Sequence, residues 1–289
     1  MKASIRGTEI FFDIEGMGLV PDGNRMRERP VAMLVHGGPG SDHTGFKPSF
    51  SPLSQRMQLV HFDQRGHGRS LRGGDVGRLT LDESVEDMEA LRKHLGLGKI
   101  VSIGHSYGGM VAQAHAARYP DSVSHLILVV TASHAGFMKR AVEIVRERGN
   151  QAQVKAAEQL FSGVLTTPEE MRAFYVAMAP LYSTTYDPKV ADGWSNERLI
   201  PSPEAQKHAF GPGGFLHTLD LRPELKNITA KTLIIAGRHD WITAPEFSEE
   251  MHRLIPGSDL RIFENSSHMV RADEHQAFID AVLGFVVYS

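Results

Sequence analysis

Five short apolar runs divide the chain into segments of strand length. Each is about five residues long, is rich in β-branched residues and mostly lacks alternation between polar and apolar positions. Parallel strands that helices cover on both faces show this pattern. The runs are Val31–Val35, Leu59–Phe62, Ile100–Ile103, Leu126–Val130 and Thr232–Ala236. A further run, Leu260–Phe263, alternates in polarity, which predicts a strand at the edge of the sheet.

Helical patterns lie between these runs. Thr80 and Glu83 form a capping-box sequence ahead of apolar residues at helical spacing, which predicts a helix that ends near Gly96. The other helices expected around the strands are Tyr107–Arg118, Pro245–Ile255 and Ala272–Phe285. This alternation of strands and helices predicts an α/β fold with a mostly parallel, doubly wound central sheet flanked by helices.

The segment from residue 134 to residue 215 interrupts the alternation. It has few strand-like runs, several amphipathic helical patterns and repeated Pro and Gly residues. We interpret it as a helical cap inserted into an α/β core that comprises residues 1–133 and 216–289.

Composition adds mainly exclusions. The 289 residues carry a net charge of −3, so we expect neither a nucleic-acid nor a membrane partner. The absence of Cys excludes a thiol nucleophile and Cys-ligated metals, and the 15 His residues lack metal-binding spacing, so no metal or other cofactor is expected. The chain start has no apolar signal region and no run reaches membrane-spanning length, which favours a cytoplasmic location.

A candidate nucleophile follows the predicted strand Ile100–Ile103. The sequence Gly104-His105-Ser106-Tyr107-Gly108 has the G-x-S-x-G pattern and stands between a predicted strand and a predicted helix. In such a turn the serine takes a strained positive φ, and its hydroxyl stands at the helix N-terminus, where a developing anion is stabilised. The sequence therefore predicts Ser106 as the nucleophile of an acyl transfer.

A base and its acidic partner are expected at the same edge of the sheet. Asp240 follows the strand Thr232–Ala236, and His268 follows the strand Leu260–Phe263. The carboxyl ends of parallel strands meet at one edge, and the chain order Ser, Asp, His suits this fold class. We therefore expect His268 to act as general base for Ser106 and Asp240 to orient His268.

A second glycine-rich turn, His36-Gly37-Gly38-Pro39-Gly40, follows the strand Val31–Val35. Glycines at this place allow the backbone to approach a substrate carbonyl. We expect the N–H groups of Gly38 and Tyr107 to form the oxyanion hole, and Gly37 to lie against the substrate.

Together these motifs resemble the proline iminopeptidase branch of the α/β-hydrolase superfamily. The resemblance covers essentially the whole predicted core. It implies a serine hydrolase with the same roles for the residues above, acting through an acyl-enzyme on a small molecule or short peptide. It also implies that the cap shapes substrate choice. The matching residues are His36–Gly40, Asp63-Gln64-Arg65-Gly66-His67-Gly68-Arg69-Ser70, Gly104–Gly109, Gly237–Asp240 and His268.

Two positions depart from the family pattern. Members that remove an N-terminal residue hold its ammonium with carboxylates, whereas this chain has Gly214 and Trp241 at two such positions. Glu197 and Glu204 in the cap are candidates for that role, and Trp241 and Phe215 are expected to supply apolar walls. A carboxylesterase or lactonase without aminopeptidase activity is therefore the alternative. A non-catalytic receptor for a small ligand is a further one, because such receptors keep the triad.

Overall fold

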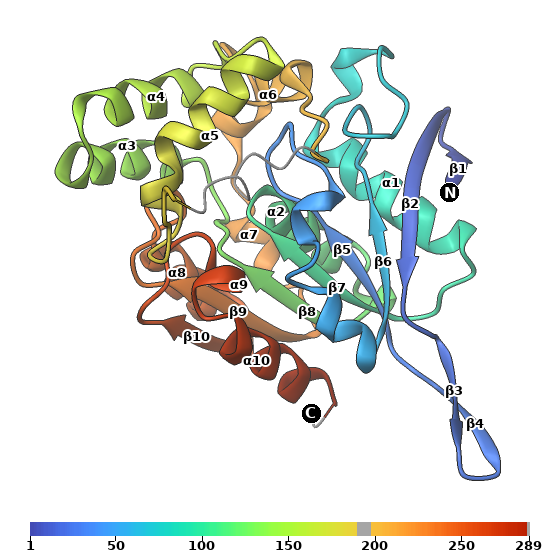
Figure 1. Ribbon diagram of the computed structural model, residues 1–289. Coiled ribbons are helices and arrows are strands. Elements are labelled where there is room, and N and C mark those ends of the chain that lie inside the picture. Colours follow the sequence, from blue (N-terminus) through green and yellow to red (C-terminus); the bar gives the residue numbers. More distant parts are fainter. Residues whose placement is uncertain (190–197, 288–289) are drawn as a thin grey trace.

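The computed structural model describes residues 1–189 and 198–287 (Figure 1). Its centre is an eight-stranded sheet in the order β1-β2-β6-β5-β7-β8-β9-β10. The strands from β5 to β10 pair in parallel, whereas β2 is antiparallel to both β1 and β6. The predicted α/β fold with a mostly parallel sheet is thus confirmed.

All the predicted strands are present in this sheet, and the last of them, β10, lies at its edge as its alternation predicts. The parallel strands are β5 (Val31–Val35), β6 (Gln58–Phe62), β7 (Ile100–His105), β8 (Val123–Val129), β9 (Lys231–Gly237) and β10 (Asp259–Phe263). The N-terminal strands are β1 (Lys2–Ile5) and β2 (Thr8–Glu15), followed by a separate hairpin of β3 (Leu19–Asp22) and β4 (Arg25–Glu28).

Helices cover both faces of the sheet, because alternate strand residues enter two apolar cores. Met33 and Val35 of β5 belong to the core beneath α1 and α2, whereas Leu34 belongs to the core that contains Phe278 of α10. The helices of this part of the fold are α1 (Leu81–His94), α2 (Tyr107–Arg118), α7 (Arg222–Leu225), α8 (Pro245–Leu254), α9 (Val270–Asp273) and α10 (His275–Val287).

The start of α1 differs in one detail from its sequence prediction. The Thr80 hydroxyl accepts a hydrogen bond from the Glu83 N–H at 3.2 Å, as expected of an N-cap. The Glu83 carboxylate, however, pairs with Arg6 at 2.9 Å and Arg78 at 2.7 Å. Only half of the capping box forms, because arginine side chains compete for the carboxylate.

The helix predicted from Ala272 is divided in two at Glu274. This residue has φ −127° and ψ 55°, outside the helical region. Its carboxylate accepts hydrogen bonds from Asn265 N at 3.1 Å and Ser266 Oγ at 2.6 Å. The loop after β10 therefore engages Glu274 and ends α9 before α10 begins.

The described part of the segment expected to form a cap, which lies between β8 and β9, contains four α-helices. In Figure 1 α3, α4 and α5 lie side by side at one end of the sheet. They are α3 (Gly136–Arg148), α4 (Gln151–Phe161), α5 (Pro168–Tyr182) and α6 (Pro203–Phe210). Within residues 1–189 and 198–287, no helix combines the length and the apolar character needed to cross a membrane.

Candidate active site

Ser106 lies in the tight turn between β7 and α2. Its φ of 56° and ψ of −124° confirm the strained backbone that the motif predicts. The Ser106 N–H donates to the Val129 carbonyl at 2.9 Å, and the Ser106 carbonyl accepts from Thr131 Oγ1 at 2.7 Å. Contacts with the end of β8 therefore hold the turn in its strained form.

Glycine is required where other backbone approaches this turn. A Cβ atom on Gly108 would lie 1.9 Å from the Val35 carbonyl oxygen, so no side chain fits there. In the turn after β5, Gly38 has φ +118°, a conformation that favours glycine. A Cβ built on Gly37 would lie 3.0 Å from the Ser106 Cβ, which places the two turns in direct contact.

His268 and Asp240 meet at the carboxyl ends of β10 and β9. His268 Nδ1 lies 2.8 Å from Asp240 Oδ2, and both side chains are buried. Asp240 also accepts hydrogen bonds from the N–H groups of Ile242 at 2.9 Å and Thr243 at 3.1 Å. Burial opposes the charge of Asp240, but His268 and these donors outweigh it and lower the pKa of the carboxyl. Asp240 is therefore ionised, and His268 donates through Nδ1 and keeps Nε2 as the acceptor.

Ser106 and His268 line the same cavity, of about 1100 Å³, which we call the site cavity. Gly37 and Gly38 form another part of its wall. The Tyr107 side chain is buried and its hydroxyl contacts Ser84 Oγ at 3.3 Å, so only the backbone of Tyr107 is suited to an oxyanion hole. The cavity thus brings a hydroxyl, an imidazole and a glycine-rich backbone together.

The loop after β6 holds the turn at His36. The Gln64 N–H donates to His36 Nε2 at 3.1 Å, and Gln64 Nε2 donates to the His36 carbonyl at 2.8 Å. Because Nε2 accepts, the ring proton is on Nδ1, which donates to the Gly37 carbonyl at 2.9 Å. Burial lowers the pKa of His36, which keeps the ring neutral as this arrangement requires. These contacts explain why the motif His36–Gly40 occurs together with the motif Asp63–Ser70.

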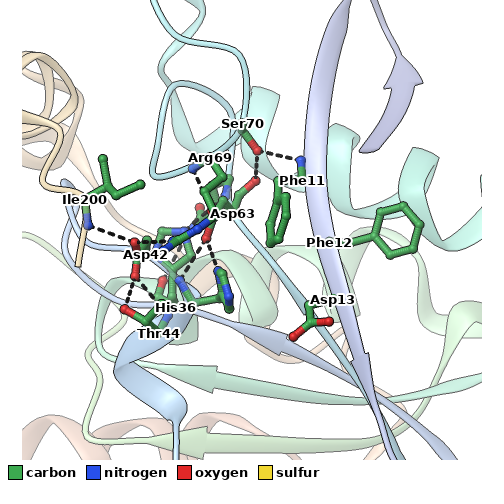
Figure 2. A network of polar contacts seen from close by, with 12 residues as sticks. Phe11, Phe12, Asp13, His36, Asp42, Thr44, Asp63, Arg69, Ser70 and Ile200 are labelled. Carbon is green, nitrogen blue, oxygen red and sulfur yellow. Dashed lines mark hydrogen bonds and ion pairs between the residues drawn. The ribbon is translucent and has the colours of Figure 1, made fainter. Parts of the chain in front are cut away.

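Figure 2 shows the polar network beside this turn. Asp63 accepts from His43 Nδ1 at 2.7 Å and from the Arg69 N–H at 2.8 Å. Asp42 accepts from Arg69 Nη1 at 3.0 Å and from the Ile200 N–H at 2.9 Å. Ligand atoms of Asp42, His43 and Asp63 lie within 4.8 Å of one another, as a metal site would need. Both carboxylates already have donors, including a guanidinium, so the network suits structural support better than a metal ion.

The same network joins the core to the chain that leads into α6. Besides Ile200, the Ser202 N–H donates to the Gly40 carbonyl at 2.9 Å. Arg69 Nη2 donates to the carbonyl of Arg198 at 3.0 Å. The glycine-rich turn is therefore hydrogen-bonded both to the loop after β6 and to the segment that precedes α6.

A family model described as alpha/beta hydrolase fold matches residues 30–274. This chain belongs to the α/β-hydrolase family. It is 30% identical over 278 residues to the proline iminopeptidase PfmaB of Pestalotiopsis fici, covering 94% of this chain and 97% of that one. It is 31% identical to a proline iminopeptidase of Saccharolobus solfataricus, covering 89% and 85%. The chain is thus a proline iminopeptidase-like hydrolase.

Solved structures show the same fold at lower identity. A proline iminopeptidase from Mycobacterium smegmatis superposes with a TM-score of 0.77 at 21% identity, covering 100% of this chain and 97% of that one. An esterase from Exiguobacterium antarcticum gives 0.75 at 20% identity, covering 98% and 97%. The fold is therefore shared by α/β hydrolases named for different reactions.

The two apolar residues expected to contact substrate in this hydrolase are not among the described residues that line the site cavity. Trp241 is 1% exposed, and its ring packs edge-on against Tyr182, with centroids 5.3 Å apart. Tyr182, rather than Trp241, lines the site cavity. Phe215 packs against Tyr107 at 5.9 Å and is likewise not among the described lining residues. Aromatic stacking between α5 and the core draws Trp241 inward, which its sequence position does not reveal.

The acids expected to contact substrate are placed differently. Glu204 pairs with Arg72 at 3.4 Å, and its side chain is 67% exposed. It borders a smaller cavity beside Arg72 and is not among the described residues that line the site cavity. Glu197 lies outside the described residues. Of the substrate contacts expected from sequence, Gly37 lines the site cavity.

Sequence reasoning missed several charged residues in the cavity of this hydrolase, and Arg271 is the one that lies closest to His268 in the sequence. Arg271 is in α9, and its side chain is 9% exposed although it lines the site cavity. It lies three positions after His268. An arginine in a polar stretch of the chain usually predicts a solvated helix position, so only the fold reveals this one.

Proposed function

We propose that this hydrolase cleaves small amides or esters through an acyl-enzyme on Ser106. The observation that carries the proposal is the His268–Asp240 hydrogen bond of 2.8 Å, in a cavity that His268 shares with the strained Ser106. His268 Nε2 takes the hydroxyl proton as Ser106 Oγ bonds to the substrate carbonyl carbon. Asp240 stabilises the imidazolium and fixes its orientation.

The same groups complete acylation and then carry out deacylation. The N–H groups of Gly38 and Tyr107 bind the oxyanion, and each such donor contributes roughly 3 kcal/mol to transition-state stabilisation. His268 gives its proton to the leaving amine or alcohol as the carbonyl reforms. His268 then takes a proton from water, whose oxygen attacks the acyl group, and returns this proton to Ser106 Oγ as the bond to the acyl carbon breaks and the acid is released.

We assign a cap role to residues 134–215 above a core of residues 1–133 and 216–289. Three helices of the inserted segment supply side chains to the wall of the site cavity. The apolar lining residues from these helices include Leu160 of α4, Tyr175 of α5 and Phe210 of α6. These apolar groups line the same cavity as Ser106 and His268, so they suit selection of an apolar acyl or leaving group.

A carboxylesterase or lactonase without aminopeptidase activity is the second candidate. A Cβ atom on Gly214 would lie 2.2 Å from the Ala209 carbonyl oxygen, so an acidic side chain does not fit there. Trp241 is buried, and Glu204 points into its pair with Arg72. These contacts favour an ester, whereas the similarity to proline iminopeptidases favours an amide.

The test compares initial rates of wild type and Ser106→Ala on proline p-nitroanilide and p-nitrophenyl butyrate. Ser49→Ala is the matched control, because Ser49 also lines the site cavity but has no part in the proposed chemistry. We expect Ser106→Ala alone to abolish hydrolysis. Full activity of Ser106→Ala would overturn the proposal.

The same assay separates the candidates. Cleavage of the prolyl anilide supports an aminopeptidase, and cleavage of the ester alone supports a carboxylesterase. A fluorophosphonate probe tests the receptor alternative. Labelling of wild type that is lost in Ser106→Ala supports the enzyme, and no labelling of folded wild type supports a receptor.

A further inference from the structure

Arg271 is a buried cation in the wall of the site cavity. It lines this cavity together with Ser106 and His268, and its side chain is nine-tenths buried. Its Nε donates to the Gly45 carbonyl at 3.2 Å, and its Nη1 donates to His105 Nε2 at 2.9 Å. These contacts use two of the five guanidinium N–H donors. Within residues 1–189 and 198–287, no carboxylate forms an ion pair with Arg271 at 4.0 Å or less.

The partners of Arg271 carry no negative charge. The His105 ring is neutral, because its Nε2 accepts the hydrogen bond from Arg271. Burial and the nearby guanidinium both lower the pKa of His105 well below its usual value. The negative charge of Asp273 favours the Arg271 cation from beyond ion-pair distance, but the Asp273 carboxylate itself accepts from Ser183 Oγ and from the Ser267 N–H at 2.9 Å. Burial lowers the pKa of Arg271 to about 10, so the guanidinium stays charged at neutral pH.

The other charged groups of the described cavity wall leave this cation unmatched. Asp42 is occupied by Arg69 and by backbone N–H groups. Lys47 pairs with Asp13, and Asp187, which is exposed, accepts from the Lys189 N–H at 2.8 Å. A buried charge without a partner is costly, so the cavity favours a ligand that supplies an anion.

We propose that Arg271 binds a carboxylate of the substrate, and that the hydrolase acts on small anionic esters or amides. This inference rests on the proposed function of Ser106, because it names the substrate of that site. Its free N–H donors on Nη1 and Nη2 suit the two oxygens of a carboxylate, an arrangement that combines charge and geometry. The same charge repels the free ammonium of an aminopeptidase substrate.

Two pairs of chromogenic esters test the charge preference on either side of the scissile bond. One compares p-nitrophenyl hydrogen glutarate with p-nitrophenyl methyl glutarate. The other compares 3-carboxy-4-nitrophenyl butyrate with 4-nitrophenyl butyrate. We expect the wild-type kcat/KM to favour the anionic member in at least one pair.

The variants then assign that preference to Arg271. We expect Arg271→Gln to lower the anionic-to-neutral ratio of kcat/KM by about 10- to 100-fold in that pair. Arg271→Lys retains part of the ratio, because the charge remains. Arg222→Gln is the control, since Arg222 is exposed and pairs with Asp220 at 2.7 Å. The ratio cancels any loss of activity that affects both esters equally.

A neutral preference of wild type in both pairs would overturn the proposal, as would an unchanged ratio in Arg271→Gln. Ser106→Ala distinguishes the proposed role of Ser106 from that of Arg271, because continued hydrolysis by this variant contradicts the role of Ser106 alone. Calorimetric binding of p-nitrophenyl hydrogen glutarate then decides the role of Arg271. Binding to Ser106→Ala that is lost in Ser106→Ala/Arg271→Gln supports it, whereas equal binding or none contradicts it.

Discussion

Gln64 donates two hydrogen bonds to His36. Its backbone N–H donates to His36 Nε2 at 3.1 Å, and its side-chain amide donates to the His36 carbonyl at 2.8 Å. His36 in turn bonds Gly37, which touches the turn of Ser106. The position of the proposed oxyanion donor Gly38 therefore depends on a residue that does not line the described site cavity.

Gln64→Ala should reduce kcat with little change in KM. Losing the side-chain hydrogen bond lets the turn shift, and a small displacement of oxyanion donors costs about 10- to 100-fold in rate. Steady-state kinetics on p-nitrophenyl butyrate measures the split. Gln276→Ala on the surface of α10 is the matched control. A larger effect on KM than on kcat would contradict a positioning role.

Asp240→Asn should lower kcat by about 10³- to 10⁴-fold while the fold is retained. An amide that donates to His268 Nδ1 would favour the tautomer with the proton on Nε2, which cannot accept the Ser106 proton. Near-ultraviolet circular dichroism checks the fold and single-turnover acylation checks the rate. An undiminished acylation rate of Asp240→Asn would contradict the proposed role of Asp240.

The placement of the candidate triad follows from sequence because each residue lies in the turn or loop that follows a strand. Ser106, Asp240 and His268 come after β7, β9 and β10, and parallel strands bring such positions to one edge. Tertiary contacts decide what sequence misses. The burial of Trp241 depends on Tyr182 of α5, and the charge of Arg271 matters only because α9 faces the cavity.

Gly108→Ala should lower the free energy of unfolding by about 3 kcal/mol or more. The added methyl would meet the Val35 carbonyl oxygen at 1.9 Å, so α2 must move away from β5. Urea denaturation measures the change. Gly98→Ala is the control, because nothing lies within 4 Å of a Cβ atom there. Equal stability of the two variants would contradict the packing argument.

Asp87→Ala should cost about 3 kcal/mol of stability, because it removes two short hydrogen bonds of the buried Arg65, which keeps a longer ion pair with Glu83 at 3.5 Å. Arg65 donates to Asp87 through Nε at 2.7 Å and Nη2 at 2.6 Å, and both side chains are buried. Asp220→Ala removes an exposed pair with Arg222 and should change stability by less than about 1 kcal/mol. Denaturant midpoints of both variants test the contrast.

Stability should fall as the pH drops below about 6.5, the usual value for histidine. Burial lowers the pKa of His61 and of His67 to about 3 each. The unfolded chain therefore binds protons below pH 6.5 that the folded chain excludes, so each histidine contributes a loss of about 1.4 kcal/mol per pH unit until its folded pKa is reached. In thermal melts from pH 7 to pH 4, His61→Gln should flatten the decline. A parallel decline would show that His61 does not contribute.

The hydrogen bonds from Ile200 and Ser202 to Asp42 and Gly40 also bear on engineering of this hydrolase. Leu160 and Tyr175 reach the cavity as side chains, so libraries at these positions reshape the pocket while the glycine-rich turn keeps its supports. Insertions or deletions in residues 198–202 disturb that turn directly. Directed evolution of selectivity should therefore vary α4 and α5 and preserve residues 198–202, which lead into α6.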